Sequence, residues 1–209
     1  VSYVQQNRKI IPVRLCGGSG SRLSLNNKNN TPKQFINFGN WTLFGKTLER
    51  VKNPLFDSPI ISTNKNYLKE VLKHLKEKRI KEFKIILEPI KKNTAPAILS
   101  SALIKDIPDN QPIVFLSSDH YLEKISQFYK SIKIHEKHLN ESNIFIFGIK
   151  PLTSSSEFGY FLSKKGINKT YKVTKFIEKP SITKAKKIIN QKAYLNSGMF
   201  FLRKISIIN

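Results

Sequence analysis

Short apolar segments alternate with longer amphipathic segments through the first two thirds of the chain. The apolar segments are rich in β-branched residues and have the length of strands, at 10–15, 60–63, 83–87, 113–116 and 144–149. Between them, apolar residues recur at helical spacing over 43–51, 68–75, 95–104 and 128–139. Such a series predicts an α/β fold: a Rossmann-like, doubly wound, mostly parallel sheet with right-handed crossovers and helices on both faces.

The pattern changes after Gly148. Pro151 and a serine cluster at 154–156 indicate a loop, and strands are expected at 158–162, 171–177 and 199–203 with a helix at 183–190. No stretch of flexible composition separates this part from the first. We therefore expect a single domain over 1–209, in which the second part is a small lobe.

Length and composition exclude several classes of protein. A chain of 209 residues buries enough surface to fold without disulfide or metal staples. A single cysteine rules out a disulfide framework, and the four histidines are not spaced as metal ligands. No apolar run approaches the roughly 18 residues that span a bilayer. With a polar N-terminal stretch, the chain is expected in the cytoplasm and away from membranes.

The charge balance is typical of a nucleic-acid-binding protein, with a formal net charge of +23. Only six of the 37 basic residues are Arg, however. Proteins that read base edges favour Arg for its bidentate geometry. We therefore do not expect specific nucleic-acid binding, and we interpret most lysines as solvated surface that also attracts anionic substrates.

Ligands of open α/β sheets bind beyond the carboxyl ends of the strands. The first expected strand is followed there by a glycine-rich turn, Gly17–Ser21, and the next residue is Arg22. Glycines let the backbone approach an anion and direct N–H groups at it. Together with Arg22 and Lys33, the turn predicts phosphate binding. Glu88 and Asp119 follow two other strands at the same edge.

The segments 17–23 and 32–35 resemble the nucleotide-binding stretch of sugar-1-phosphate nucleotidylyltransferases. The segments 86–89 and 93–97 are similar to those of mannose-1-phosphate guanylyltransferases within that family. More matching segments follow in the family's order: 118–120, 147–149, 158–160, 176–180 and 196–200. The resemblance covers about residues 11–203 and implies a fold of the nucleotide-diphospho-sugar transferase type. It also implies that 1–150 bind nucleotide and that 151–209 begin a sugar-binding part.

The resemblance implies transfer of GMP from GTP to mannose-1-phosphate, which yields GDP-mannose and pyrophosphate with Mg²⁺ as cofactor. The residues it places around the nucleotide are Gly17, Gly18, Ser19, Gly20, Ser21, Arg22, Lys33, Glu88, Asn93 and Thr94. Those it places at the sugar phosphate are Gly159, Glu178, Lys179 and Asn196. The catalytic residues would be Arg22, Lys33 and Asp119, with Asp119 also binding the metal ion.

The residues themselves allow plainer interpretations. Asp119 could cap a turn, Glu178 and Lys179 could be an exposed pair at a strand end, and 93–96 could be a capped helix entry. Cys16 is expected to be a small core residue and not a nucleophile, because no histidine lies near it in the sequence.

Three features depart from the family pattern. Residues 24–27 replace the family's Trp-Pro-Leu-Ser segment, and Arg14 lies inside a strand, where it must either reach an end of the sheet or destabilise the strand. The sequence also stops before the family's second metal-binding Asp and C-terminal β-rich region. The alternatives left open are a non-catalytic remnant of such an enzyme and another sugar-1-phosphate nucleotidylyltransferase. The sequence also leaves open whether the chain forms a homo-oligomer.

Overall fold

The computed structural model describes residues 8–17, 31–89, 94–166 and 170–208. The chain divides into two compact units. The first consists of Val1–Ile144 with Phe201–Asn209, and the second of Phe145–Phe200. Each unit is described by itself.

The first unit is built on parallel strands in the order β3-β2-β1-β4. Their bounds are β1 Ile11–Cys16, β2 Ile60–Asn64, β3 Lys84–Glu88 and β4 Pro112–Ser117. Strand β1 lies between β2 and β4, where Val13 is opposite Ile60 on one side and Phe115 on the other. All three side chains are buried, as expected for a parallel sheet that is covered on both faces.

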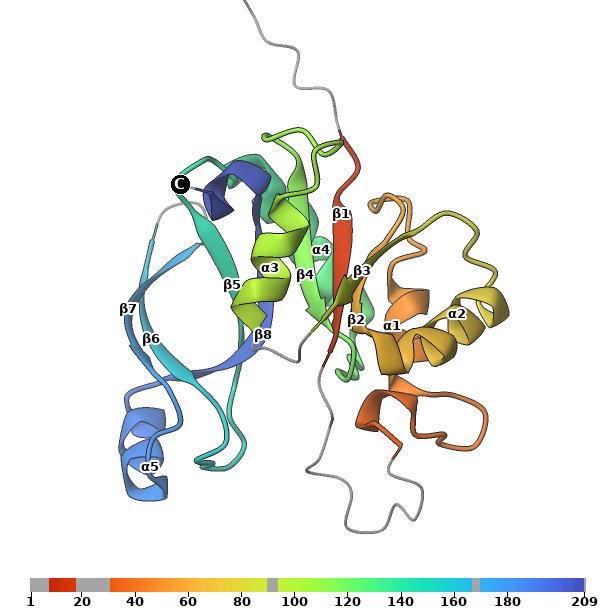
Figure 1. The fold of residues 1–209 in the computed structure, drawn as a ribbon. Helices are drawn as coiled ribbons and strands as arrows, with labels where there is room; N and C mark the ends of the chain where they lie inside the picture. The colour runs from red at the N-terminus through yellow and green to blue at the C-terminus, as the bar shows by residue number, and fades with distance from the viewer. Residues whose placement is uncertain (1–7, 18–30, 90–93, 167–169, 209) are drawn as a thin grey trace, which may run out of the picture. The chain divides into compact units, whose positions relative to one another are not determined.

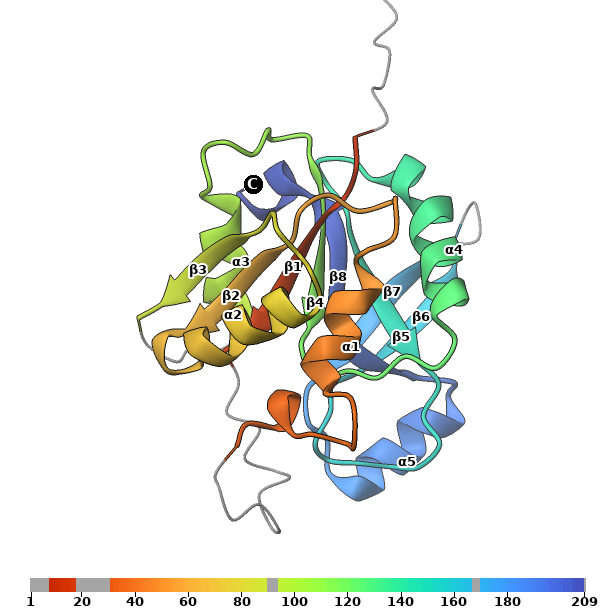
Figure 2. The same ribbon diagram turned by 90° about the vertical axis from the view of Figure 1, so that its right-hand side faces the viewer.

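Helices cover both faces of this sheet. Helices α1 and α2 lie on one face and α3 on the other (Figures 1 and 2). The α-helices of the unit are α1 Leu43–Arg50, α2 Leu68–Glu77, α3 Thr94–Ala102 and α4 Ile125–His135. The short 3-10 helices are η2 Lys33–Phe35, η3 Lys65–Tyr67, η4 Glu136–His138 and η5 Lys204–Ile207. The predicted doubly wound α/β fold is confirmed.

Helix α1 begins at a side-chain cap. The Thr42 hydroxyl accepts a hydrogen bond from the backbone N–H of Gly45 at 2.9 Å, which satisfies one of the free donors of the first turn. Phe44 and Leu48 then lie on the buried face of the helix and pack in one cluster with Phe35 and Cys16. This cluster fixes α1 and η2 beside the end of β1.

Cys16 is fully buried in that cluster, as the sequence predicts for a core residue. Burial raises the pKa of its thiol to about 11, so the reactive thiolate is scarce at neutral pH. A nucleophilic role is therefore disfavoured.

Arg14 does not reach an end of the sheet. Its side chain is fully buried, and its Nη2 donates a hydrogen bond to the backbone carbonyl of Thr47 in α1. The Nε and Nη1 atoms have no hydrogen-bond partner. Of the two outcomes expected from the sequence, the first is wrong, because α1 covers the strand and leaves the side chain no path to water.

The second unit combines antiparallel strands with one helix. Its elements are β6 Tyr160–Lys165, β7 Tyr171–Ile177 and α5 Ile182–Asn190, together with most of β5 Ile144–Ile149 and of β8 Tyr194–Arg203, whose residues 144 and 201–203 belong to the first unit. Strand β6 pairs antiparallel with β7 and β8, and β5 pairs with β8. Tyr160, Ala185, Ile188 and Ala193 form its small core. Helix α5 begins at Ser181, whose hydroxyl accepts from the backbone N–H of Lys184.

Strand β8 is longer than the sequence predicts. It begins at Tyr194 and not at residue 199. Asn196, Ser197 and Gly198 have low strand propensity and indicate a turn when taken alone. Tyr194 and Leu195 nevertheless pair with β6, and the strand then continues through residues 196–198. Tertiary pairing overrides local preference here.

No helix in the described part of the chain is both long and apolar enough to cross a bilayer.

Candidate active site

The carboxyl ends of β1, β3 and β4 lie at one edge of the sheet. Gly17 directly follows β1, Glu88 is the last residue of β3, and Asp119 follows β4 after one intervening residue. Strands β1, β2, β3 and β4 pair in parallel, so the carboxyl ends of β1, β3 and β4 lie at this same edge. The edge is where ligands bind in open α/β sheets.

Glu88 lies directly against the backbone of Gly17. Its Oε1 accepts a hydrogen bond from the Ser62 hydroxyl at 2.7 Å. A Cβ atom added at Gly17 would lie only 2.7 Å from Glu88 Oε2, closer than real Cβ contacts. A side chain at position 17 would therefore require the Glu88 carboxylate, which Ser62 holds, to shift.

Asp119 is partly buried and surrounded by donors. The Ser117 hydroxyl donates to Oδ1 and Lys33 Nζ lies 3.3 Å from Oδ2, while His120 Nε2 lies 3.8 Å from Oδ1. Burial raises the pKa of Asp119, but the hydrogen bond from Ser117 and the charges of His120 and Lys33 outweigh it, so the pKa lies below its ordinary value. Asp119 is therefore a carboxylate at neutral pH.

Lys33 reaches Asp119 because a short helix holds it. Lys33 is the first residue of η2, and Phe35 at the other end is buried against Phe44 with ring centroids 5.5 Å apart. The Lys33 side chain is 32% exposed. The ammonium group thus stands between the sheet edge and water, where it can meet an incoming anion.

A divalent cation could take the place of the Lys33 ammonium at the Asp119 carboxylate, which is ionised and 32% exposed. Among the described residues there is no group of three or more His, Cys, Asp or Glu side chains that could hold a metal ion. Asp119 would therefore supply one oxygen ligand, and the other ligands would be phosphate and water oxygens, which Mg²⁺ prefers.

Several residues predicted for the nucleotide lie outside the described residues, and the structure does not test them: Gly18, Ser19, Gly20, Ser21, Arg22 and Asn93. Thr94 is exposed and is the first residue of α3, so a helix begins at this point, while the capping position 93 lies outside the described residues.

In the second unit, the structure brings together three of the four residues predicted for the sugar phosphate. The backbone N–H of Asn196 donates to the carbonyl of Gly159 at 2.8 Å. A Cβ at Gly159 would lie 2.6 Å from Glu178 Oε2. Lys179 follows Glu178 with a φ of 41°, in the left-handed region that side chains other than glycine rarely adopt.

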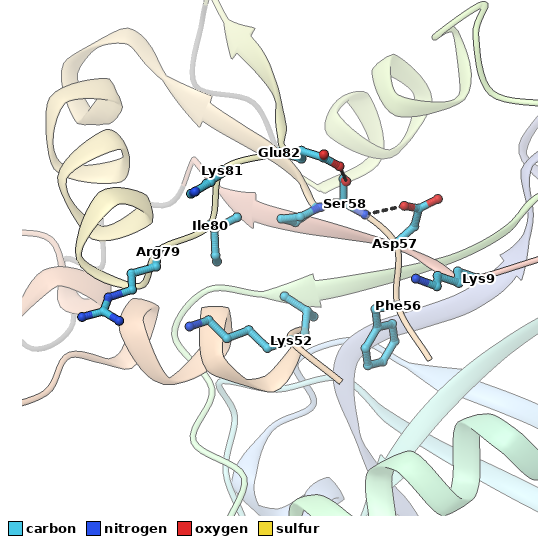
Figure 3. Close-up of a pocket in the computed structure, with 11 residues that line it drawn as sticks. Lys9, Lys52, Phe56, Asp57, Ser58, Arg79, Ile80, Lys81 and Glu82 are labelled. Atoms are coloured by element: carbon cyan, nitrogen blue, oxygen red, sulfur yellow. Dashed lines mark hydrogen bonds between the residues drawn. The ribbon is translucent and has the colours of Figure 1, made fainter. Parts of the chain in front are cut away.

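A hollow of about 400 Å³ lies at the opposite, amino-terminal end of β1, β2 and β3 (Figure 3). Phe56 and Ile80 line it together with several charged side chains. Its carboxylates Asp57 and Glu82 both accept hydrogen bonds from Ser58, as the figure shows. None of the predicted site residues lies in this hollow.

The nucleotidyl transferase family model matches residues 11–207, almost the whole chain. The chain belongs to the nucleotidyl transferase family.

Curated proteins similar to the chain are named mannose-1-phosphate guanylyltransferase. The chain is 32% identical over 203 residues to a mannose-1-phosphate guanylyltransferase of Salmonella montevideo, covering 93% of this chain and 43% of the relative. It is 31% identical over 203 residues to a mannose-1-phosphate guanylyltransferase of Escherichia coli, again covering 93% of this chain and 43% of the relative. The chain thus spans less than half the length of these curated relatives. The resemblance seen in the sequence is confirmed.

Solved structures share the fold. One described as mannose-6-phosphate isomerase from Helicobacter pylori matches with a TM-score of 0.78 and 29% identity, over 96% of this chain and 72% of that one. One described as mannose-1-phosphate geranyltransferase from Thermus thermophilus matches with a TM-score of 0.81 and 23% identity, over 96% of this chain and 59% of that one.

Two hydroxyl groups of this nucleotidyl transferase chain escaped the sequence analysis. Ser62 holds Glu88, and Ser117 holds Asp119. A single serine carries no motif. Ser117 is the last residue of β4 and lies two residues before Asp119 in the sequence. Ser62 lies in the middle of β2, and only the pairing of β2 with β3 brings it to Glu88.

Proposed function

We propose that this chain transfers GMP from GTP to mannose-1-phosphate and releases pyrophosphate. One observation carries the proposal: Gly17, the anchored carboxylate of Glu88 and the Lys33–Asp119 pair meet at one edge of the sheet. The similarity to relatives named mannose-1-phosphate guanylyltransferase supports this choice of base and sugar.

The proposed reaction needs no covalent enzyme intermediate. An oxygen of the sugar phosphate attacks the α-phosphorus of GTP, the bond to the bridging oxygen breaks, and pyrophosphate leaves with the electron pair. Mg²⁺ held by Asp119 would offset charge on the phosphates. The protein's task is therefore to place the two substrates in line and to stabilise charge.

Lys33 and Asp119 change partners in this proposal. Their ion pair of 3.3 Å keeps both charges satisfied before substrate binds. Asp119 would hold the cation, and the Lys33 ammonium would then lie close to the phosphates without its partner. It can then stabilise negative charge that develops on the departing pyrophosphate.

Glu88 is suited to select the base. Its carboxylate accepts hydrogen bonds only, and Ser62 fixes its orientation. Guanine presents adjacent N–H donors on one edge, whereas adenine at the same edge presents an acceptor. A fixed carboxylate therefore favours guanine, in agreement with the role that the family resemblance gives to this residue.

The second unit is proposed to bind the sugar. Glu178 and Asn196 meet at Gly159 and supply the acceptors and donors that hydroxyl groups need. Lys179 offers a positive charge to the sugar's phosphate.

The test is a matrix of nucleoside triphosphates and sugar-1-phosphates, with pyrophosphate release measured in the presence of Mg²⁺. We expect the highest kcat/KM for GTP with mannose-1-phosphate. A preference for UTP or dTTP with glucose-1-phosphate would assign the chain to another specificity of the family. A folded chain that releases no pyrophosphate with any pair would identify a non-catalytic remnant.

A further inference from the structure

Arg50, the last residue of α1, is a charged side chain buried beside the Asp119 turn. It is only 2% exposed. Its Nη2 donates a hydrogen bond of 2.8 Å to the backbone carbonyl of His120. Burial lowers the pKa of Arg50 to about 10, so the guanidinium remains charged at neutral pH. A buried cation thus holds the residue that follows Asp119.

No Asp or Glu among the described residues forms an ion pair with this guanidinium. All 14 Asp and Glu residues of the chain fall within the described ranges. None of the ion pairs formed among the described residues includes Arg50 or Arg14. In both arginines the Nε and Nη1 atoms lack a hydrogen-bond partner.

This arrangement is costly for a residue with a packing role only. A buried charge without a counter-charge destabilises a fold, and an apolar side chain of similar volume commonly serves packing better. The one hydrogen bond that Arg50's guanidinium makes is therefore the feature that calls for an explanation, and it points to the turn over 117–120.

The surroundings direct the guanidinium to that turn. Arg14 in β1 donates to the carbonyl of Thr47, which lies one helical turn before Arg50 on the same face of α1. The like charge of Arg14 disfavours a position of the Arg50 guanidinium close to β1. Tyr129 in α4 donates its hydroxyl to the Arg50 carbonyl at 2.8 Å and fixes the residue's backbone.

We propose that Arg50 is a positioning residue for Asp119, acting through its hydrogen bond to the carbonyl of His120. The turn over 117–120 is also tied to β1 by the Ser118 hydroxyl, which donates to the Leu15 carbonyl at 2.9 Å. Arg50 supplies the second tie, from the helix layer. The two ties together set the direction of the carboxylate between them. The part of this inference that concerns the metal ion rests on the proposed function.

The first test measures hydrogen–deuterium exchange of the amides over 117–121, which requires no turnover. Loss of a hydrogen bond to a charged group predicts roughly tenfold or faster exchange in Arg50→Met. Arg50→Lys keeps one charged donor and is expected to exchange at an intermediate rate.

Arg203→Met is the matched control. Arg203 also donates to backbone carbonyls, those of Leu139 and Asn110, at 3.0 and 2.6 Å. It lies outside the Asp119 turn, so the control loses the same kind of contact without loosening 117–121. Exchange over 117–121 that is no faster in Arg50→Met than in Arg203→Met would overturn the proposal. If Arg50→Met does not fold, the same comparison is made between Arg50→Lys and Arg203→Lys.

The second test measures Mn²⁺ binding by electron paramagnetic resonance in the presence of GTP. Loss of a residue that orients a metal ligand commonly costs tenfold or more in affinity, so roughly tenfold weaker binding is expected in Arg50→Met and none of this loss in Arg203→Met. Faster exchange with unchanged Mn²⁺ affinity would overturn the link between Arg50 and the metal. A failure of the parent chain to release pyrophosphate would count against the proposed function. The exchange experiment would still test whether Arg50 holds the turn over 117–120, because it requires no turnover.

Discussion

The two units hold their candidate site residues in different ways. In the first unit, Glu88 is fixed by Ser62, and Asp119 is fixed by Ser117 and Lys33. In the second, Glu178 and Lys179 are exposed, and neither side chain forms a hydrogen bond or ion pair with another described residue. The proposed nucleotide side is thus built before substrate arrives, whereas on the sugar side the substrate itself must supply the partners.

The difference follows from the sheets. Strand β1 lies between β2 and β4 in a parallel sheet covered by helices, so polar side chains at the carboxyl ends of these strands have neighbours on adjacent elements. Strand β7 pairs antiparallel with β6 and is exposed along all of its residues but the last. Residues that follow such a strand have few neighbours to fix them.

The contrast between the two units fails if the fixed carboxylate of Asp119 is not needed for activity. Asp119→Asn removes the charge that would hold the cation but keeps the shape, and we expect kcat to fall by about a hundredfold or more. Asp106→Asn is the control, because Asp106 is 81% exposed and its partner among the described residues is the surface side chain of Lys84. Steady-state pyrophosphate release measures both. A fall in Asp119→Asn no larger than in the control would contradict the assignment.

Gly17 and Gly159 allow a direct comparison of the two units, because a Cβ at either position would meet a carboxylate, that of Glu88 or of Glu178. In Gly17→Ala the new Cβ meets a Glu88 that Ser62 holds, and we expect the KM for GTP to rise by roughly tenfold or more. In Gly159→Ala the new Cβ meets exposed Glu178 and the ring of Phe176, which can move, so a smaller rise in the KM for mannose-1-phosphate is expected.

The glycine prediction has its own internal check. Adding Ser62→Ala to Gly17→Ala frees Glu88 to move away and should recover part of the loss. Initial rates with each substrate varied in turn measure these effects. Equal effects at Gly17 and Gly159 would contradict the idea that one carboxylate is anchored and the other is free.

Replacing Lys179 tests the exposed residues that we propose bind the sugar phosphate in the second unit. Lys179→Ala keeps the left-handed backbone but removes the charge, and we expect the KM for mannose-1-phosphate to rise about tenfold with kcat nearly unchanged. Lys192→Ala is a close control, because Lys192 is also an exposed lysine of the second unit with a positive φ, of 62°. A change in the KM for GTP instead would assign Lys179 to the other substrate.

Replacing Arg14 tests how far a buried charge lowers the free energy of unfolding. Arg14→Met replaces a fully buried guanidinium with two unpartnered nitrogens by an apolar side chain. We expect the free energy of unfolding, measured in urea, to rise by about 1 kcal/mol or more. A less stable variant would show that the hydrogen bond to Thr47 outweighs the burial of the charge.

The sequence predicts most of the fold because its apolar pattern is regular. The strand expected at 113–116 is β4, Pro112–Ser117, and the helix expected at 43–51 is α1, Leu43–Arg50. The predicted start of β8 is wrong, because Asn196 and Gly198 indicate a turn and only pairing with β6 makes them part of a strand.

The site is predictable in its residue types but not in its contacts. Position after a strand identifies Gly17, Glu88 and Asp119. The pairing of Lys33 with Asp119 depends on how η2 packs through Phe35, which no local pattern contains. The serines that hold the carboxylates, and the direction of Arg50, likewise depend on the layers of the fold.

The central claim is that the sheet edge at Gly17, Glu88 and Asp119 transfers a nucleotidyl group and does not merely bind or hydrolyse GTP. The direct measurement uses GTP labelled at the α-phosphorus in one reaction and at the γ-phosphorus in another, with mannose-1-phosphate and Mg²⁺. The account predicts that the α label enters a nucleotide sugar and that the γ label appears in pyrophosphate in equal amount. Recovery of the α label only as GTP, GDP or GMP from a folded chain would contradict it.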